Sequence, residues 1–222
     1  MYRENFLELI ERFGADRVVN VLAPHLLDRR KARIDEVIER RLGSVEVAIE
    51  SLVDPYNALA VMRTAEALGV TRMHLIQTQV RKRARASMGT YRWIDCRRSS
   101  SVESFFEGRG RVFAADVSGK IGVEEIPVDK PLVLLFGNEH SGLSKEALNR
   151  ADATFKIPIY GMVESYNLSV AAAIALFDVT KRRRQFLGSE GDLSEKEKVI
   201  ERAFGYYQTV GPETTKKILC RN

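Results

Sequence analysis

The sequence contains few residues of the types that build disulfide frameworks and metal centres. Its 222 residues include two cysteines, Cys96 and Cys220, and three histidines. Two cysteines are too few for a disulfide framework or a four-cysteine zinc site, and no histidine stands at metal-ligand spacing from other ligand residues. We therefore expect two free thiols without a chemical role, in a reducing compartment, and no bound metal ion.

Long apolar runs are also missing. The longest, Leu168–Val179, contains Ser169 and Asp178 and is shorter than the about 20 residues that a membrane-spanning helix needs. The N-terminus enters an amphipathic pattern directly, without the apolar core of a signal peptide. We expect a cytoplasmic protein with no membrane segment.

The composition excludes wholesale disorder. Hydrophobic residues make up 45% of the chain and charged residues 29%, which is enough apolar material to bury a core. The length suits one domain with extensions or two small domains. Lysine and arginine number 35 against 30 acidic residues, and this excess of +5 is unevenly placed.

Hydrophobic periodicity divides the chain into three parts. Residues 1–44 predict a first helix over 1–22 with a break at Gly14 and, after Pro24, a second helix with a basic face. Residues 45–187 alternate between strand and helix patterns, which predicts an α/β domain with a mostly parallel sheet and helices on both faces. Residues 188–222 predict a C-terminal helical extension, in which Ser194 and Glu197 are spaced as a capping box.

Three polar segments follow predicted strands, where a parallel sheet normally places its site. The first carries Asn57 and Arg63, the second is Gly137–Gly142 with Glu139, and the third carries Ser165 and Asn167. None is a dinucleotide fingerprint or a P-loop.

Each segment also has a purely structural interpretation. Asn57, Ser165 and Asn167 suit helix N-caps, and Arg63 suits a surface arginine whose stem lies along the helix. The second segment suits a plain turn, with His140 as a surface turn residue.

Taken together and in this order, the three segments resemble the SpoU/TrmH family of the SPOUT methyltransferases. These enzymes use S-adenosyl-L-methionine to methylate ribose 2′-hydroxyls of RNA. The resemblance covers about residues 28–187, and it is greatest to the branch that methylates guanosine 18 in the D-loop of tRNA. It implies a deep C-terminal trefoil knot and a homodimer, neither of which composition or periodicity indicates.

The resemblance also implies site residues. The catalytic motif residues fall on Asn57, Arg63, Glu139, Ser165 and Asn167. Cofactor contacts fall on Ala115, Gly137, Ile157, Tyr166 and Leu168, and Tyr166 departs from the leucine that is often seen in the family. A guanidinium is effectively always protonated, so we expect Arg63 to anchor an RNA phosphate and stabilise the developing alkoxide. The proton would leave through that phosphate or a water molecule.

Clustered cations predict the surface that holds tRNA. The expected RNA-binding residues are Arg29, Arg30, Arg33, Arg40, Arg41, Lys181 and Arg183. Further basic runs lie at 81–85 and at Arg97-Arg98.

Two alternatives stay open. One is a ribosomal RNA 2′-O-methyltransferase of the same family, although the short N-terminal part favours tRNA. The other is an RNA-binding knot protein without catalysis, against which the four residues Asn57, Arg63, Glu139 and Asn167 argue.

Overall fold

The protein forms two compact units. A computed structural model describes residues 2–78 and 92–220, so the predicted basic run at 81–85 lies outside the described residues. Unit 1 combines the chain up to Arg41 with the chain from Glu190 onward, and unit 2 is Leu42–Ser189. The two ends of the chain, which the sequence presented as separate extensions, thus share one unit.

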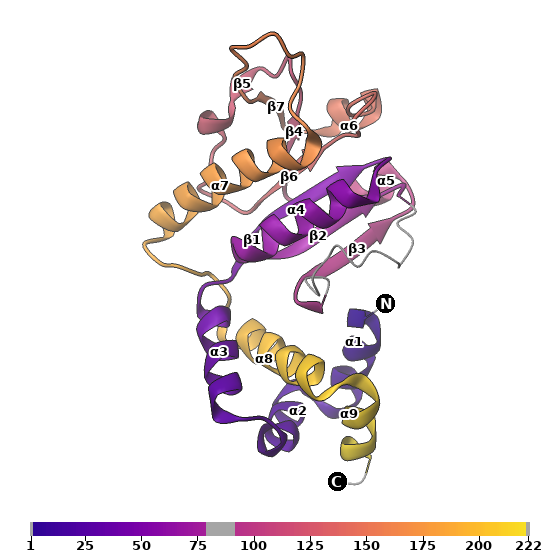
Figure 1. The fold of residues 1–222 in the computed structure, drawn as a ribbon, viewed down its shortest axis with the longest axis vertical. Coiled ribbons are helices and arrows are strands. Elements are labelled where there is room, and N and C mark those ends of the chain that lie inside the picture. Colours follow the sequence, from indigo (N-terminus) through magenta and orange to yellow (C-terminus); the bar gives the residue numbers. More distant parts are fainter. Residues whose placement is uncertain (1, 79–91, 221–222) are drawn as a thin grey trace. The chain divides into compact units, whose positions relative to one another are not determined.

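Unit 2 contains a seven-stranded sheet in which neighbouring strands pair in parallel (Figure 1). The order is β3-β2-β1-β6-β4-β7-β5. This confirms the α/β class and the parallel sheet. The strands are β1 (Leu42–Glu50), β2 (Val70–Ile76), β3 (Asp95–Ser99), β4 (Arg111–Ala115), β5 (Ile121–Gly122), β6 (Leu132–Phe136) and β7 (Ala153–Lys156).

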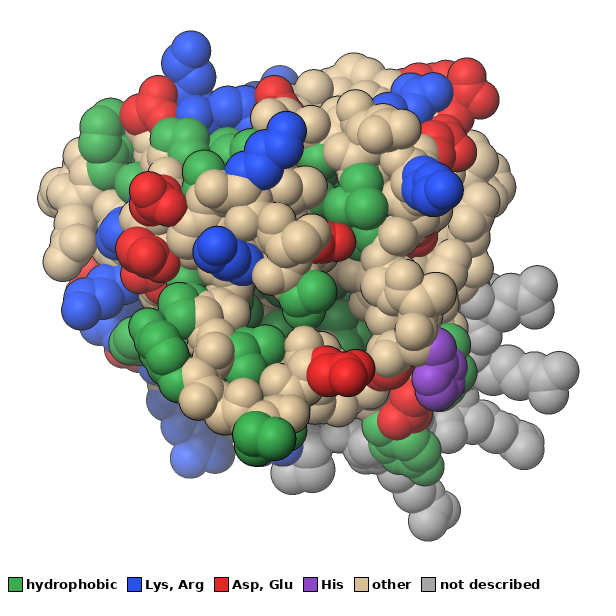
Figure 2. Space-filling view, turned by 90° about the horizontal axis from the view of Figure 1, so that it is seen from above, with side chains coloured by type: hydrophobic (Ala, Val, Ile, Leu, Met, Phe, Trp, Pro, Cys, Tyr) green, Lys and Arg blue, Asp and Glu red, His purple; other side chains and the backbone are tan. Residues whose placement is uncertain are grey.

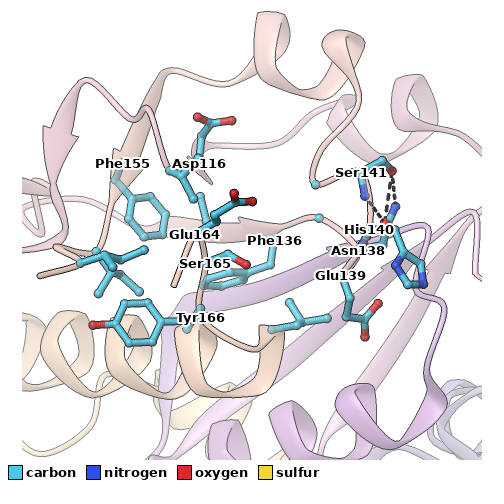
Figure 3. Close-up of a pocket in the computed structure, with 18 residues that line it drawn as sticks. Asp116, Phe136, Asn138, Glu139, His140, Ser141, Phe155, Glu164, Ser165 and Tyr166 are labelled. Carbon is cyan, nitrogen blue, oxygen red and sulfur yellow. Dashed lines mark hydrogen bonds between the residues drawn. The ribbon is translucent and has the colours of Figure 1, made fainter. Parts of the chain in front are cut away.

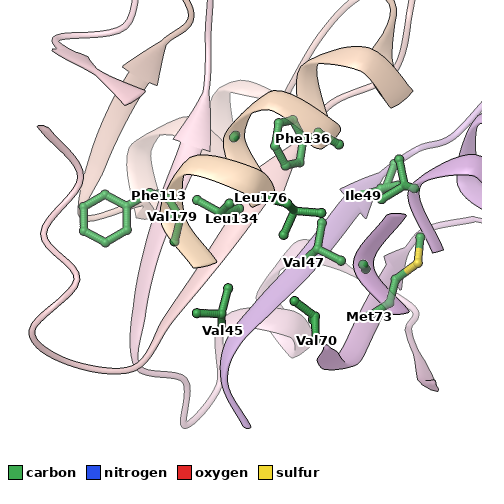
Figure 4. Close-up of a cluster of buried hydrophobic side chains, with 14 of the residues drawn as sticks. Val45, Val47, Ile49, Val70, Met73, Phe113, Leu134, Phe136, Leu176 and Val179 are labelled. Carbon is green, nitrogen blue, oxygen red and sulfur yellow. The ribbon is translucent and has the colours of Figure 1, made fainter. Parts of the chain in front are cut away.

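Four helices cover the two faces of this sheet. They are α4 (Pro55–Ala67), α5 (Val102–Phe106), α6 (Lys145–Arg150) and α7 (Leu168–Leu187). Helices α4 and α7 share one hydrophobic cluster with the sheet (Figure 4), and α5 and α6 share the other.

Strand β6 shows why both faces must be covered. Leu134 and Phe136 belong to the cluster under α4 and α7, whereas Val133 and Leu135 belong to the cluster under α5 and α6. Side chains alternate between the faces of a strand, so a continuous apolar run buries both. The run at 132–136 therefore forms a central strand.

A buried polar network connects β1 and β2. His74 is fully buried, with its Nε2 atom 2.6 Å from Glu46 Oε2 and its Nδ1 atom 3.2 Å from an Arg109 nitrogen. Burial lowers the pKa of His74, and the neutral tautomer with its proton on Nε2 satisfies both contacts. Burial alone would raise the pKa of Glu46, but the hydrogen bond with His74 and the charge of Arg72 outweigh it, so that pKa is lowered.

The basic run at the end of α7 packs into unit 2. Arg182 donates to the carbonyl oxygens of Ile126 and Val123, at 2.6 and 2.9 Å. Arg183 donates to Ser44 Oγ at 2.9 Å and to the Val128 carbonyl at 2.7 Å. These guanidinium groups satisfy buried and partly buried acceptors. Without a donor, such acceptors would destabilise the fold.

Unit 1 is helical. It consists of α1 (Tyr2–Phe13), α2 (Ala15–Leu22), a 3-10 turn (Ala23–His25), α3 (Asp28–Glu39), α8 (Glu195–Val210) and α9 (Pro212–Leu219). The predicted break at Gly14 is confirmed, with φ of 79°, and so is the capping box of Ser194 and Glu197.

The core of unit 1 joins residues from both ends of the chain. The ring of Phe6 lies 5.0 Å from Phe204 and 5.4 Å from Tyr207, and all three side chains are buried. Arg3 pairs with Glu201 and lies over the Phe204 ring. The N-terminal helices therefore need α8 to cover their apolar face.

Replacing Arg183 should destabilise unit 2. We expect Arg183→Ala to lower the free energy of unfolding by about 2 kcal/mol, because two partly buried acceptors lose a charged donor. Urea denaturation followed by fluorescence of Trp93, the single tryptophan of the chain, measures this. The matched control is Lys181→Ala at an exposed position of the same helix, which should change stability by less than about 0.5 kcal/mol. Equal effects of the two variants would contradict the packing role of Arg183.

Candidate functional site

A cavity of about 380 Å³ opens beyond the carboxyl ends of β4, β6 and β7. Its lining comes from three segments: residues 115–117 at the end of β4, residues 136–142 from the end of β6, and the stretch from Phe155 in β7 to Ala171 in the first turn of α7 (Figure 3). Figure 2 views the molecule from above, and hydrophobic side chains are visible inside a hollow. The site thus lies at the edge of the sheet where the polar segments were expected to meet.

The second segment forms a turn held by close backbone contact. Asn138 and Gly142 exchange two backbone hydrogen bonds of 3.1 Å. A Cβ atom on Gly137 would lie 2.0 Å from the Gly142 carbonyl carbon, so no larger residue fits there. The side-chain oxygen of Asn138 also accepts from the backbone N–H groups of His140 and Ser141, at 2.9 and 2.8 Å. The turn therefore has a fixed backbone on one side of the pocket.

A side-chain hydrogen bond connects this turn to α4. The Nδ2 atom of Asn57 donates to Oε1 of Glu139. Asn57 is buried, and the N-cap of α4 is instead Asp54, which accepts from the Tyr56 N–H at 2.9 Å. The interpretation of Asn57 as a helix cap is therefore wrong. The other oxygen of Glu139, Oε2, is buried and has no hydrogen-bond partner within the described residues.

Glu50, to which no sequence motif pointed, holds the far end of the turn. This residue ends β1, is 2% exposed, and accepts from the Ser144 N–H at 2.9 Å. Ser144 in turn caps α6 by accepting from the Ala147 N–H. The signal in the sequence was an acidic residue at the end of an otherwise apolar strand.

The third segment closes the opposite wall. The hydroxyl of Tyr166 donates to the Pro158 carbonyl at 3.0 Å and ties the two ends of the loop together. Asn167 caps α7, accepting from the backbone and hydroxyl of Ser169. The structural interpretation of Asn167 is thus confirmed, while Ser165 stays exposed and lines the pocket.

The structure brings most of the predicted site residues together. Glu139 and Ser165 line the pocket. So do the five predicted cofactor residues, Ala115, Gly137, Ile157, Tyr166 and Leu168. Asn57 joins them through Glu139. Arg63 does not line the pocket: it is exposed on α4, with no hydrogen bond or ion pair to another described residue.

Several lining residues were not named as site residues, although Asn138 and His140 lie in the predicted segment Gly137–Gly142. They include Asp116, Phe136, Asn138, His140, Phe155 and Glu164. Asp116 directly follows strand β4, so the same rule about carboxyl ends could have found it. The aromatic rings lie within strands, where a sequence does not distinguish core from pocket.

The predicted RNA-binding cations differ in exposure. Four are exposed: Arg29, Arg33, Arg40 and Lys181. Arg33 and Arg40 both pair with Glu36, at 2.7 and 3.0 Å, and Arg30 is half-buried beside Thr209.

Two of these cations are buried. Arg41 is 4% exposed and Arg183 is 6% exposed. A guanidinium must reach solvent to meet a phosphate, so we do not retain Arg41 and Arg183 as RNA-binding residues.

The family model described as the SpoU rRNA methylase family matches residues 44–177, which include the whole pocket and all of the sheet except the first two residues of β1. The chain belongs to the SpoU rRNA methylase family. A tRNA (guanosine(18)-2′-O)-methyltransferase of Thermus thermophilus is 36% identical over 70% of this chain and 84% of its own.

Two solved structures are similar to this chain of the SpoU family. The Aquifex aeolicus TrmH/SpoU tRNA modifying enzyme superposes with a TM-score of 0.72 at 28% identity, over 83% of this chain and 98% of its own. The AdoMet-bound rRNA methyltransferase of Sinorhizobium meliloti superposes with a TM-score of 0.59 at 29% identity, over 67% of this chain and 60% of its own.

The described residues hold neither a metal-binding cluster nor a membrane-spanning helix. Within residues 2–78 and 92–220, no group of three or more His, Cys, Asp or Glu side chains could hold a metal ion. In the same part of the chain, no helix has the length and apolar character to cross a membrane.

Substituting Gly137 should disrupt the pocket without unfolding the sheet. We expect Gly137→Ala to push the turn away from β6, because its Cβ would collide with backbone atoms of Gly142 and Leu143. Calorimetry should show S-adenosyl-L-methionine binding weakened by at least about tenfold, equivalent to about 1.4 kcal/mol. The matched control is Gly161→Ala, since a Cβ at that loop glycine meets nothing within 4 Å. Unchanged binding by Gly137→Ala would show that the turn tolerates the displacement.

Proposed function

We propose that this protein transfers the methyl group of S-adenosyl-L-methionine to a ribose 2′-hydroxyl of tRNA, at guanosine 18 of the D-loop. The observation that carries the proposal is the pocket, where all five expected cofactor residues meet Glu139 and, through it, Asn57. The family match and the similarity to tRNA (guanosine(18)-2′-O)-methyltransferases support the same activity. With tRNA as its substrate, the reaction would take place in the cytoplasm.

The pocket fits the cofactor in size, polarity and charge. Its volume lies within the range of small-molecule sites. Phe136, Phe155 and Leu168 give it apolar walls, while the carboxylates of Asp116 and Glu164 suit a cationic ligand. The Oε2 atom of Glu139, which has no partner in the described part of the chain, offers a further buried acceptor. When bound, the cofactor supplies a methyl group on a positively charged sulfur.

The chain's own residues would then orient the ribose. Glu139 is fixed by Asn57, so its second oxygen can hold a donor of the ligand in one place. Arg63 projects from the same helix as Asn57 and has no partner within the described residues, which leaves its guanidinium available for the adjacent RNA phosphate. A permanent positive charge there also stabilises the developing alkoxide.

We further propose that two chains assemble and that residues towards α7 are threaded as a trefoil knot. Tyr160 and Met162 are almost fully exposed beside the pocket, and Phe177 is 61% exposed on α7. Large apolar side chains as exposed as these favour burial against another surface, here that of a second copy. The backbone at Gly119 lies directly against that of Phe155, where a Cβ atom on Gly119 would be 2.3 Å from the Phe155 carbonyl carbon. Crossing chain segments would need such close backbone contact.

Substrate RNA would also contact residues outside the pocket. We propose three parts with distinct roles: an N-terminal basic arm over residues 1–44, the methyltransferase domain over 45–187, and the C-terminal extension over 188–222, which completes the core of the arm. Arg29, Arg33 and Arg40 are exposed on the arm and Lys181 on α7. Phosphate contacts of this kind make binding fall steeply with salt.

The product on unmodified tRNA tests the function. Incubation with labelled S-adenosyl-L-methionine should place one 2′-O-methyl group on guanosine 18 of a tRNA transcript, mapped by resistance to alkaline hydrolysis. Methylation of ribosomal RNA fragments in place of tRNA would favour the rRNA alternative. Failure of the chain to bind the cofactor in calorimetry would favour an inactive RNA-binding module. Sedimentation of the same preparation should show two chains, and a monomer would contradict the proposed dimer.

Replacing Arg63 with lysine separates geometry from charge. Arg63→Lys keeps the positive charge but loses the planar fork that contacts a phosphate at two points. We expect kcat to fall by about 100-fold, the scale of one lost donor to a developing oxyanion, with cofactor affinity unchanged in calorimetry. The matched control is Arg150→Lys on α6, where the exposed side chain pairs with Glu146. Near-normal turnover of Arg63→Lys would exclude this role.

A further inference from the structure

A second pocket lies at the edge of the sheet where β4 and β6 begin. It has a volume of about 350 Å³, and none of the residues that line it lines the first pocket. Strand β4 runs from Arg111 in this pocket to Ala115 in the first, and β6 runs from Leu132 to Phe136 in the same way. We call it the arginine pocket, because its charged lining residues are Arg72, Arg97, Arg109, Arg111, Glu46 and Glu107.

The arginine pocket lies on the face of the sheet that carries α5 and α6. Glu46 points to the same face as Ala48, which packs in the cluster under these helices. Arg72 is the partner of Glu46 on β2, and Arg97 is the partner of His74 on β3. With five and six residues, α5 and α6 are about 8 and 9 Å long, whereas the nine residues of β1 extend over about 30 Å. Helices this short leave part of the face uncovered, which gives room for a pocket.

Positive charge is concentrated around Arg109. Its terminal nitrogens contact Glu46 Oε2 at 3.3 Å and His74 Nδ1 at 3.2 Å, so the guanidinium is held in place. Burial lowers the pKa of Arg109, Glu46 opposes this effect, and the charges of Arg97 and Arg72 lower the pKa further. These guanidinium groups therefore repel one another, and an anion between them would relieve the repulsion.

Two arginines of the pocket keep donors that no described residue accepts. The Nε atom of Arg97 pairs with Asp95 at 2.8 Å, and the two terminal nitrogens of Arg97 have no hydrogen bond within the described residues. The Nε atom of Arg72 is buried without a hydrogen-bond partner in the same part of the chain, since the Asp95 carboxylate lies 3.6 Å away. A buried donor of this kind is costly unless something accepts from it.

The turn between α5 and β4 adds backbone donors. It has the sequence Gly108-Arg109-Gly110, and Gly108 has a φ of 65°. The N–H groups of Gly108 and Gly110 make no hydrogen bond to another described residue. A Cβ atom on Gly108 would meet nothing within 4 Å, and one on Gly110 would meet only the Pro131 carbonyl oxygen at 3.9 Å. A ligand can therefore approach this backbone closely, as anions do at glycine-rich turns.

The chemistry of the lining selects a phosphate group. Guanidinium groups bind phosphate oxygens at two points, and backbone N–H groups supply further donors. No aromatic ring is present among the described residues that line the pocket, so it offers no surface on which a nucleobase would stack. Of its two glutamates, Glu46 is paired with Arg72 and Arg109, and Glu107 is exposed to solvent.

We propose that the arginine pocket binds a phosphate group, which accepts from Arg97, Arg72 and the backbone of the 108–110 turn. Arg109 supplies a fixed positive charge behind these donors. The phosphate belongs to an RNA strand or to a small phosphorylated molecule, and the chemistry of recognition is the same for both. This site is separate from the pocket of the proposed methyl transfer.

Titration with pyrophosphate in a phosphate-free buffer tests the site. Calorimetry of the wild type should give a Kd below about 1 mM. We expect Arg97→Gln to weaken binding by at least about tenfold, and Arg97→Lys, which keeps the charge, to retain part of the affinity. The matched control is Arg98→Gln, since Arg98 is the next residue of β3, is exposed, and does not line the pocket. A wild type that binds no pyrophosphate, or equal affinities of Arg97→Gln and Arg98→Gln, would overturn the proposal.

Binding of unmodified tRNA by the same variants identifies the source of the phosphate. If an RNA phosphate occupies the pocket, Arg97→Gln should bind tRNA at least about threefold more weakly than Arg98→Gln, and its slope of log affinity against log salt should fall by about 1. If a small molecule occupies it, the two variants should bind tRNA equally while pyrophosphate still distinguishes them. Both results support a phosphate site. Methyl transfer takes no part in these titrations, so a wild type that methylates no RNA would overturn the proposed function and leave this inference standing.

Discussion

The hydrogen bond between Asn57 and Glu139 joins two segments that lie 82 residues apart in the chain. It fixes the first turn of α4 against the turn after β6, at the carboxyl edge of adjacent strands. Both residues are held from behind, Asn57 by the helix that Asp54 caps and Glu139 by the narrow Gly137–Gly142 turn. Because both partners are fixed, the pocket has one end with a defined shape before any ligand enters.

The central part of the fold follows from local patterns. The apolar run at 132–136 coincides with β6, since a strand buried on both faces is apolar throughout. Strand β3, with the sequence Asp-Cys-Arg-Arg-Ser, was not predicted, because it lies at the sheet edge and exposes two arginines. The strand β5 was missed too, because two residues carry no periodicity.

The site was predictable in its residues but not in its contacts. Polar residues after strands located the pocket, and the family resemblance named its lining. Charge patterns were less informative, because Arg182 and Arg183 belong to a run that looks solvated yet bind carbonyl oxygens inside unit 2. A sequence does not show which face of α7 meets the sheet, nor that Glu46, His74 and Arg109 form one buried network.

The shared core of unit 1 sets the order in which the two units can fold while the chain is being synthesised. The helices α1 to α3 are made first, but the rings that cover Phe6 belong to Phe204 and Tyr207, near the end. Unit 2 can complete its sheet in the interval, since all its strands precede residue 190. The first helices therefore leave the ribosome with an uncovered apolar face, and unit 1 can close only after α8 has left the ribosome as well.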